Sequence, residues 1–336
     1  MNISVLGDGA WGTTLAMLLA DNGHDVRLWS AFEENATAMR TDRCNRKFLG
    51  DFPFPDRLQV VSKEAEATAE AELLVLAIPS QFMREGLERF QRCKPAKSAI
   101  LVDVAKGIEC ETLLRPSEIV AQVWGRDDCA VLSGPSHAEE VVRRIPTAVT
   151  VGCENANLAK TIQTAFMAEY FRVYTVSDSI GVELGGALKN VFAVAAGICD
   201  GMGLGDNSKA ALLTRGIAEM ARFGGRLGGS PETFAGLSGV GDMIVTCTSQ
   251  HSRNRHVGEE LGRGKTLDEI QNEMGMVVAE GVRTSASAFR LARKLQVETP
   301  IIDEVHAVLY EDKPAAQAVS DLMTRRPTSE NPIGPV

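Results

Sequence analysis

A lysine and an asparagine, Lys189 and Asn190, interrupt the small, apolar run "GALKNVFAVAAG". A lysine is almost never fully buried unless its ammonium is paired, so this one either reaches solvent along its own stem or has a partner. On a helix, Lys189 shares a face with Gly185 and Phe192, so close packing is expected around it. A lysine in such surroundings is a candidate to give a proton to a reacting oxygen or to take one from it.

The stretch "GLSGVGDMIVTCTSQHSRNR" (236–255) holds the densest set of polar residues. Asp242 lies between glycines and an apolar "MIV", where an unpaired carboxylate would be costly. A helix is expected to begin near Arg253 and Asn254, and several hydroxyls could cap it: Thr246, Thr248, Ser249 and Ser252. A hydroxyl-rich helix N-terminus that carries an arginine suits a phosphate group. Ordinary capping beside a surface arginine is the alternative, and it is credible for Ser252.

Two further polar stretches follow predicted strands. In "VDVAKGIE" the strand ends at Lys106, and in "LSGPSHAEE" it ends at Gly134 and Ser136. The carboxyl ends of parallel strands form the ligand crevice of an open sheet, so Lys106 could meet an anionic substrate there. A solvated loop lysine explains the first stretch equally well, and a plain turn by itself explains the second stretch better. His137 lies close to the same crevice, and no role is assigned to it.

The N-terminal segment "ISVLGDGAWG" contains Gly7, Gly9 and Gly12 in a G-x-G-x-x-G pattern, directly after a predicted strand and at the start of a helix. These glycines permit a tight turn, close approach of a pyrophosphate and close packing of helix on strand. The motif alone is weak evidence, but its position between strand and helix favours a dinucleotide site over a structural turn.

The choice between NAD and NADP is left open by the end of the second predicted strand. The acid that commonly binds the ribose there is missing: Ser30 and Ala31 occupy the place, and neither an arginine nor a lysine stands there to hold a 2′-phosphate. Glu33 and Glu34 follow closely and would repel a 2′-phosphate. NAD is therefore slightly favoured.

Strands and helices, which must position these residues, are predicted to alternate in the first half of the chain. Near-continuous apolar runs separated by helical-period segments predict a parallel sheet covered on both faces. The expected strands are residues 3–7, 25–30, 73–79, 99–105, 130–135, 148–152 and 171–176. Beyond residue 180 only helices are expected, at 183–200, 207–223, 252–263, 266–274, 281–296 and 300–310. The predicted architecture is an α/β domain over residues 1–180 and an all-helical domain over residues 181–336.

Composition narrows the class of protein. The chain has 336 residues and a net charge of −9, which argues against nucleic acid or an anionic membrane as its main partner. Seven scattered cysteines without a C-x-x-C pair predict a reduced chain with no zinc site, and the five histidines lack metal-ligand spacing. We expect no signal peptide, no apolar run long enough to span a bilayer, and a cytoplasmic location.

Taken together, these stretches resemble the bacterial type of NAD(P)-dependent sn-glycerol-3-phosphate dehydrogenase. The matching segments run in order from residue 7 to about residue 285 and include "GDGAWGTTLA", "LAIPSQFMR", "AKGIE", "LSGPSHAEE", "GVELGGALKN", "GDMIVTCTSQHSRN" and "VVAEGVRTS". The resemblance implies reversible reduction of dihydroxyacetone phosphate to sn-glycerol 3-phosphate, which supplies the backbone of glycerophospholipids. It also implies a Rossmann-type domain joined to a helical substrate domain, usually as a homodimer.

The resemblance and the motifs together predict the residues of the site. The family's proton-transferring lysine falls on Lys189, with Lys106 and Asp242 beside it. Predicted substrate contacts are Lys106, Gly134, Ser136, Lys189, Asn190, Asp242, Thr246, Ser252, Arg253 and Asn254. Predicted cofactor contacts are Gly7, Gly9, Ala10, Trp11, Gly12, Ala31, Phe32, Lys106, Ala138, Arg253, Val278 and Glu280.

The match has departures, and two rival functions stay open. Ala31 stands where many bacterial members have an arginine or histidine, Ala10 replaces a common serine, and "FEE" (32–34) is similar to eukaryotic relatives that use NAD. One rival is a related dehydrogenase acting on a hydroxy acid, against which the "SRN" and "GDMIVTCTS" segments argue. The other is a dinucleotide sensor without turnover, for which the polar crevice residues would be expected to be eroded.

Overall fold

The computed structural model describes residues 1–275 and 279–330 and divides the chain into two compact units. The first comprises Met1–Lys106 and Leu114–Ser179, and the second comprises Gly107–Leu113 and Ile180–Val336. The short excursion belongs to the second unit because Ser287 donates to the Ile108 carbonyl at 2.9 Å and Arg290 donates to the Cys110 carbonyl at 2.7 Å. The domain boundary predicted at residue 180 places Gly107–Leu113 in the first domain, whereas the structure groups this segment with the second unit.

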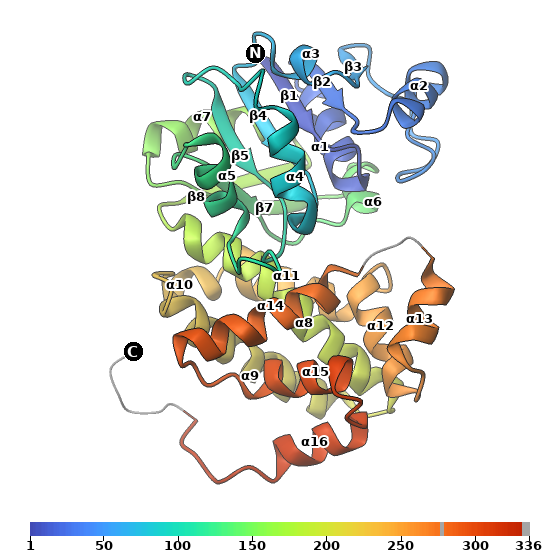
Figure 1. Ribbon diagram of the computed structural model, residues 1–336, viewed down its shortest axis with the longest axis vertical. Helices are drawn as coiled ribbons and strands as arrows, with labels where there is room; N and C mark the ends of the chain where they lie inside the picture. The colour runs from blue at the N-terminus through green and yellow to red at the C-terminus, as the bar shows by residue number, and fades with distance from the viewer. Residues whose placement is uncertain (276–278, 331–336) are drawn as a thin grey trace. The chain divides into compact units, whose positions relative to one another are not determined.

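The first unit is built on one eight-stranded sheet in the order β3-β2-β1-β4-β5-β6-β7-β8 (Figure 1). Its strands are β1 (Asn2–Leu6), β2 (Asp25–Trp29), β3 (Leu58–Val61), β4 (Leu73–Leu76), β5 (Ile100–Asp103), β6 (Ala130–Ser133), β7 (Thr147–Gly152) and β8 (Phe171–Val176). Neighbours from β3 to β6 pair in parallel. The strand order reverses at β1, between β2 and β4, and such switch points are where open α/β sheets bind ligands.

Alternating residues of the central strands enter two separate hydrophobic layers. Ile3 and Val5 of β1 pack into one layer and Leu6 into the other, and Val75 and Leu76 of β4 divide in the same way. Both faces are therefore covered, which explains why these strands read as continuous apolar runs. The covering helices are α1 (Ala10–Asp21), α2 (Glu33–Asp42), α3 (Glu64–Thr68), α4 (Met83–Arg89), α5 (Pro116–Trp124), α6 (Ala138–Val141), α7 (Ala156–Phe166) and the 3₁₀ turn η1 (Ser80–Phe82).

The parallel sheet predicted from the sequence is present, with one antiparallel pairing towards one end. Strands β7 and β8 are parallel to each other, but β7 pairs antiparallel with β6. The connection between β6 and β7 contains only the four-residue helix α6, which is about 6 Å long and too short to carry the chain back for a parallel crossover. The edge strand β3 was also not predicted, because it has only four residues and one of them, Gln59, is exposed.

The second unit is helical and is organised around the long helix α8 (Figure 1). Its helices are α8 (Ser179–Gly201), α9 (Asp206–Gly225), α10 (Pro231–Phe234), the π-helical turn η2 (Leu237–Gly241), α11 (Asp242–Thr248), α12 (Arg253–Gly262), α13 (Leu267–Met274), α14 (Glu280–Leu295), α15 (Pro300–Tyr310) and α16 (Ala315–Met323). The α/β and all-α class predicted from the sequence is confirmed, although α10, α11 and α16 were not predicted.

Helix α8 corrects the expectation that no segment is long and apolar enough to cross a membrane. By length and composition it passes that test, and its apolar window is completely buried inside the protein. Residues 181–199 of α8 are all buried. Apart from Glu183, Lys189 and Asn190, these residues are apolar or small, as is typical of a helix that is surrounded by its own unit.

Candidate functional site

The glycine loop joins β1 to α1 at the point where the sheet order reverses. Gly7 has φ of +121°, and a Cβ there would lie 2.5 Å from the Ala77 carbonyl oxygen, while a Cβ on Gly12 would overlap the Gly7 carbonyl oxygen. A Cβ on Gly9 meets no atom of residues 1–275 or 279–330 within 4 Å. Gly7 and Gly12 are thus required by the fold, whereas the space beside Gly9 and the N-terminus of α1 fit a pyrophosphate.

The loop is tied to the end of β2 through the side chain and backbone of Asp8. The buried Ser30 hydroxyl donates to Asp8 Oδ2 at 2.7 Å. On the other side, Asn45 Nδ2 donates to the Asp8 carbonyl at 2.7 Å and to Thr13 Oγ1 at 2.8 Å. Sequence reasoning missed this network. Its signal was an acid inside the glycine motif, but the partners come from distant segments.

The other predicted cofactor residues of the first unit differ in how far their side chains are exposed to solvent. Phe32, at the N-cap of α2, is 66% exposed, and the adjacent Ala31 is half-buried. Trp11 packs against the core beside Phe171, with ring centroids 6.4 Å apart, so its indole is turned largely inward. Ala10 and Ala138 are the first residues of α1 and α6, where backbone N–H groups lack intrahelical partners.

Lys106, Gly134 and Ser136 are brought together at the carboxyl ends of β5 and β6. The Gly134 carbonyl accepts from the Lys106 ammonium at 3.1 Å and from the Ser136 hydroxyl at 2.8 Å. Gly134 has φ of +148°, and a Cβ there would lie 2.9 Å from Val149 Cα. The fold therefore demands glycine here, and the loop presents an ammonium and a hydroxyl side by side.

Lys189 is buried at 7% exposure on α8, and its ammonium is paired. It donates to Asp242 Oδ1 at 2.7 Å and to Thr246 Oγ1 at 2.6 Å, and both partners lie on α11. Thr246 in turn donates to the Asp242 carbonyl at 2.6 Å. The predicted association of Lys189 with Asp242 is present. Thr246 is hydrogen-bonded to both members of this pair and does not cap α12.

Small residues let α8 approach the segments that carry these partners. A Cβ on Gly185 would lie 2.6 Å from the Ser238 carbonyl oxygen in the turn η2, directly before Asp242. Further along α8, a Cβ on Gly197 would overlap the Arg255 carbonyl of α12. The nearby thiol of Cys247 is inert packing, because burial raises its pKa to about 12. The apolar, glycine-rich sequence around Lys189 is thus a close-packing requirement.

Asn190 and Asn254 form a hydrogen-bonded link between α8, α12 and α14. Asn254 Nδ2 donates to Asn190 Oδ1 at 2.9 Å, and Asn254 Oδ1 accepts from the Gly281 backbone N–H at 2.9 Å. Both side chains are buried. The structure therefore gives these two residues a positioning role, and their predicted contact with substrate remains a prediction.

Ser252 and Arg253 have different roles at the start of α12. The Ser252 hydroxyl accepts from the Arg255 backbone N–H at 3.2 Å, which makes it the N-cap. Arg255 is held by Asp200, its Nε lying 2.6 Å from Oδ2. Arg253 is exposed, and no carboxylate pairs with it in the part of the chain that the structure describes. Its guanidinium is available for a phosphate.

One predicted cofactor contact, Glu280, lies at the start of α14. Glu280 is the first residue of that helix and is half-buried, next to Gly281. Val278 lies outside the described residues.

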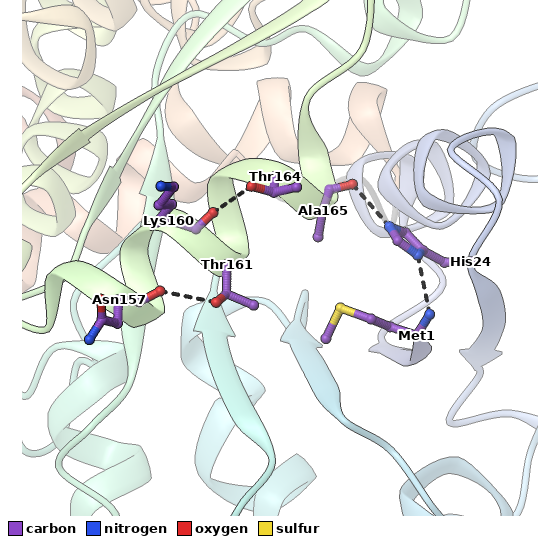
Figure 2. Close-up of a pocket in the computed structure, with 7 residues that line it drawn as sticks. All are labelled: Met1, His24, Asn157, Lys160, Thr161, Thr164 and Ala165. Carbon is purple, nitrogen blue, oxygen red and sulfur yellow. Dashed lines mark hydrogen bonds between the residues drawn. The ribbon is translucent and has the colours of Figure 1, made fainter.

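A hollow of about 530 Å³ in the first unit contains none of the predicted site residues (Figure 2). It is lined by Met1, His24, Asn157, Lys160, Thr161, Thr164 and Ala165. Met1 precedes β1, so this hollow lies at the amino end of a strand whose carboxyl end carries the glycine loop. We assign it no part in the chemistry.

Comparison with known proteins identifies the family. Residues 2–159 match the N-terminal profile of the NAD-dependent glycerol-3-phosphate dehydrogenases and residues 178–320 match the C-terminal profile. A glycerol-3-phosphate dehydrogenase [NAD(P)+] of Chlorobium chlorochromatii is 50% identical over 333 residues, which are 98% of this chain and 99% of the relative. The chain belongs to this family. The same named enzyme of Geobacillus thermodenitrificans is 52% identical over 96% of this chain and 95% of its own.

Solved structures agree with this assignment. The glycerol-3-phosphate dehydrogenase of Coxiella burnetii has a TM-score of 0.92 and 37% identity, covering 96% of this chain and 99% of its own. A D-mandelate dehydrogenase shares the fold at a TM-score of 0.62 with 14% identity, and that likeness concerns the fold alone. Within the glycerol-3-phosphate dehydrogenase family, NAD or NADP is the cofactor, as the sequence predicted.

Proposed function

We propose that this protein catalyses the reversible reduction of dihydroxyacetone phosphate to sn-glycerol 3-phosphate with NADH or NADPH. The observation that carries the proposal is the buried ion pair between Lys189 and Asp242, at 2.7 Å, in a chain that belongs to the glycerol-3-phosphate dehydrogenase family. A buried lysine that is held by a carboxylate and a hydroxyl is a prepared proton donor.

The proposed role of Lys189 follows from the geometry of its ammonium. An ammonium has three N–H donors, and two of them are directed at Asp242 and Thr246. The third can donate to the carbonyl oxygen of the substrate and protonate the alkoxide that develops there. When bound, the dihydronicotinamide supplies the hydride for the carbonyl carbon. Asp242 and Thr246 hold the ammonium in place and balance its charge.

The phosphate of the substrate is assigned to the N-terminus of α12. Arg253 offers an uncommitted guanidinium there, and the first backbone N–H groups of the helix add donors. Asn190 and Asn254 keep this helix end in register with α8. In the first unit, Lys106, Gly134 and Ser136 are proposed as further contacts of the substrate, and Lys106 also of the cofactor.

The cofactor is assigned to the glycine loop and the N-terminus of α1. The open space beside Gly9 supports this assignment, as does the position of the loop at the switch point of the sheet. We further propose Phe32 and Ala138 as contacts in the first unit, and Arg253 and Glu280 in the second.

We also propose that the enzyme is a cytoplasmic homodimer whose product supplies the backbone of glycerophospholipids. All seven cysteines are free in the structure, which suits a reducing compartment. Light scattering after gel filtration tests the dimer: a mass of one chain, 36.1 kDa, would contradict it.

The activity is tested by the oxidation of NADH and NADPH in the presence of dihydroxyacetone phosphate. Saturable oxidation that is far slower with unphosphorylated dihydroxyacetone supports the proposal. Turnover of 3-hydroxyisobutyrate or 6-phosphogluconate with NAD(P)+ instead would favour the hydroxy-acid rival. Tight cofactor binding without turnover of any of these substrates would favour the sensor.

A further inference from the structure

The end of β2 in this chain lacks the acidic side chain that commonly binds the adenosine ribose of NAD. Ser30 occupies the position after the strand, and it is completely buried. Its hydroxyl donates to Asp8 Oδ2 at 2.7 Å, and it also bonds with the backbone of Phe32. The end of β2 therefore holds a carboxylate after all, contributed by the glycine loop.

We propose that Asp8 takes the place of the missing acid and makes this enzyme select NAD(H) over NADP(H). This inference rests on the proposed function and adds to it the determinant of cofactor choice. A carboxylate at the end of β2 accepts from a ribose 2′-hydroxyl and repels a 2′-phosphate. No other residue of the glycine motif carries a charge.

The position of Asp8 is fixed from several sides. Besides Ser30, Asn35 Nδ2 reaches Asp8 Oδ2 at 3.5 Å, so the partners of the carboxylate are neutral donors and its negative charge is not cancelled. Asn45 and Thr13 bind the Asp8 carbonyl at 2.7 and 3.2 Å and hold the backbone. Asp8 is 9% exposed, so only a small part of it can meet a ligand.

The cations nearby have other partners. Arg40 pairs with Glu33, and the Arg89 guanidinium pairs with Glu64 at 2.6 Å. The Lys47 ammonium donates to Asn35 Oδ1 at 3.2 Å and lies over the Phe48 ring. Lys47 is the one of these three whose partner is neutral, so it is the residue through which a 2′-phosphate could be favoured, and the test must include it.

The test measures equilibrium binding of NADH and NADPH by fluorescence, without substrate. Wild type is expected to bind NADH at least about tenfold more tightly than NADPH. Asp8→Asn keeps the shape and removes the charge, so it should reduce this ratio about tenfold, mainly by tightening NADPH. Asp8→Ala is the second variant if Asp8→Asn does not fold. Asp25→Asn is the matched control, because it removes an exposed acid at the other end of β2, where Asp25 pairs with Arg57, and it should leave the ratio within about twofold.

Three results would overturn the inference. They are equal affinity of wild type for NADH and NADPH, an unchanged ratio in the Asp8 variant that folds, and a wild-type preference for NADPH, which Lys47→Ala would trace to Lys47 if it abolished it. None of these results contradicts the proposed reaction, because the experiment measures binding of the dinucleotide and not turnover. A protein that binds neither dinucleotide would refute the proposed function and, with it, the inference.

Discussion

The Lys189 ammonium and the Asp242 carboxylate form a 2.7 Å ion pair in which the side chains are only 9% and 1% exposed. The two residues are 53 positions apart in the chain, on α8 and α11. Separating two such charges inside a protein is costly, and removing one of them leaves the other unpaired. The same pair therefore governs both the stability of the second unit and the chemistry proposed for it.

Asp242→Asn is expected to destabilise the protein more than the loss of both charges does. The single change leaves a buried ammonium without its counter-ion and should lower the free energy of unfolding by about 3 kcal/mol. Lys189→Met combined with Asp242→Asn removes both charges and should recover part of that loss. Urea unfolding of wild type, both single variants and the double variant gives the coupling energy. Simple additivity of the two single effects on the free energy of unfolding would show that Lys189 and Asp242 do not stabilise each other.

Arg253→Ala should act mainly on the phosphate of the substrate. Loss of a charge-assisted contact should raise the KM for dihydroxyacetone phosphate by about one to two orders of magnitude and change kcat less. Arg263→Ala is the matched control, because Arg263 lies at the other end of α12 and pairs with Glu259 and Glu260. If Arg253→Ala still discriminates against unphosphorylated dihydroxyacetone as wild type does, the phosphate assignment is wrong.

Gly9→Ala and Gly12→Ala should fail in different ways. A methyl group on Gly9 meets only open space, so Gly9→Ala should fold normally and bind NADH at least about tenfold more weakly. A methyl group on Gly12 would overlap the Gly7 carbonyl, so Gly12→Ala should lose several degrees of thermal stability before any ligand is added. Thermal melting and NADH titration of both variants separate the two effects. Undiminished NADH affinity in Gly9→Ala would contradict the assignment of the pyrophosphate to this loop.

Glu219 should make the second unit less stable as pH rises. Its buried carboxylate accepts from the backbone N–H groups of Ile301 and Ile302 at 3.0 and 2.9 Å and caps α15. Burial raises the pKa of Glu219 to about 7. Because the folded-state pKa exceeds the unfolded value, this contribution to stability is complete below about pH 4.5 and is lost as pH rises through about 7.

The change Glu219→Gln tests this linkage. The amide cannot titrate, so the free energy of unfolding of the variant relative to wild type should rise between pH 5 and pH 8, by up to about 3 kcal/mol. Chemical unfolding of both proteins across that range measures the difference. A constant difference at every pH would show that Glu219 does not titrate in this range.

Lys189 and Asp242 could be predicted from the sequence because each is a charge inside an apolar, glycine-rich run, and a globular core tolerates such a charge only when it is paired. The direction of β7 could not be predicted, since an apolar run reads the same in parallel and antiparallel pairing. Asp8 was missed because its partner Ser30 comes from another strand and its meaning depends on that contact. Thr246 was expected at a helix cap, and only the register of α11 against α8 shows that it serves Lys189.

The most direct test of the account compares wild type with Lys189→Ala in steady-state oxidation of NADH by dihydroxyacetone phosphate. The exposed lysine change Lys160→Ala serves as control. We expect Lys189→Ala to lower kcat by about two to four orders of magnitude, with the Kd for NADH within about threefold of wild type because Lys189 is not among the proposed contacts of the cofactor. A Lys189→Ala enzyme that keeps near-normal kcat would contradict the assignment of Lys189 as the proton donor.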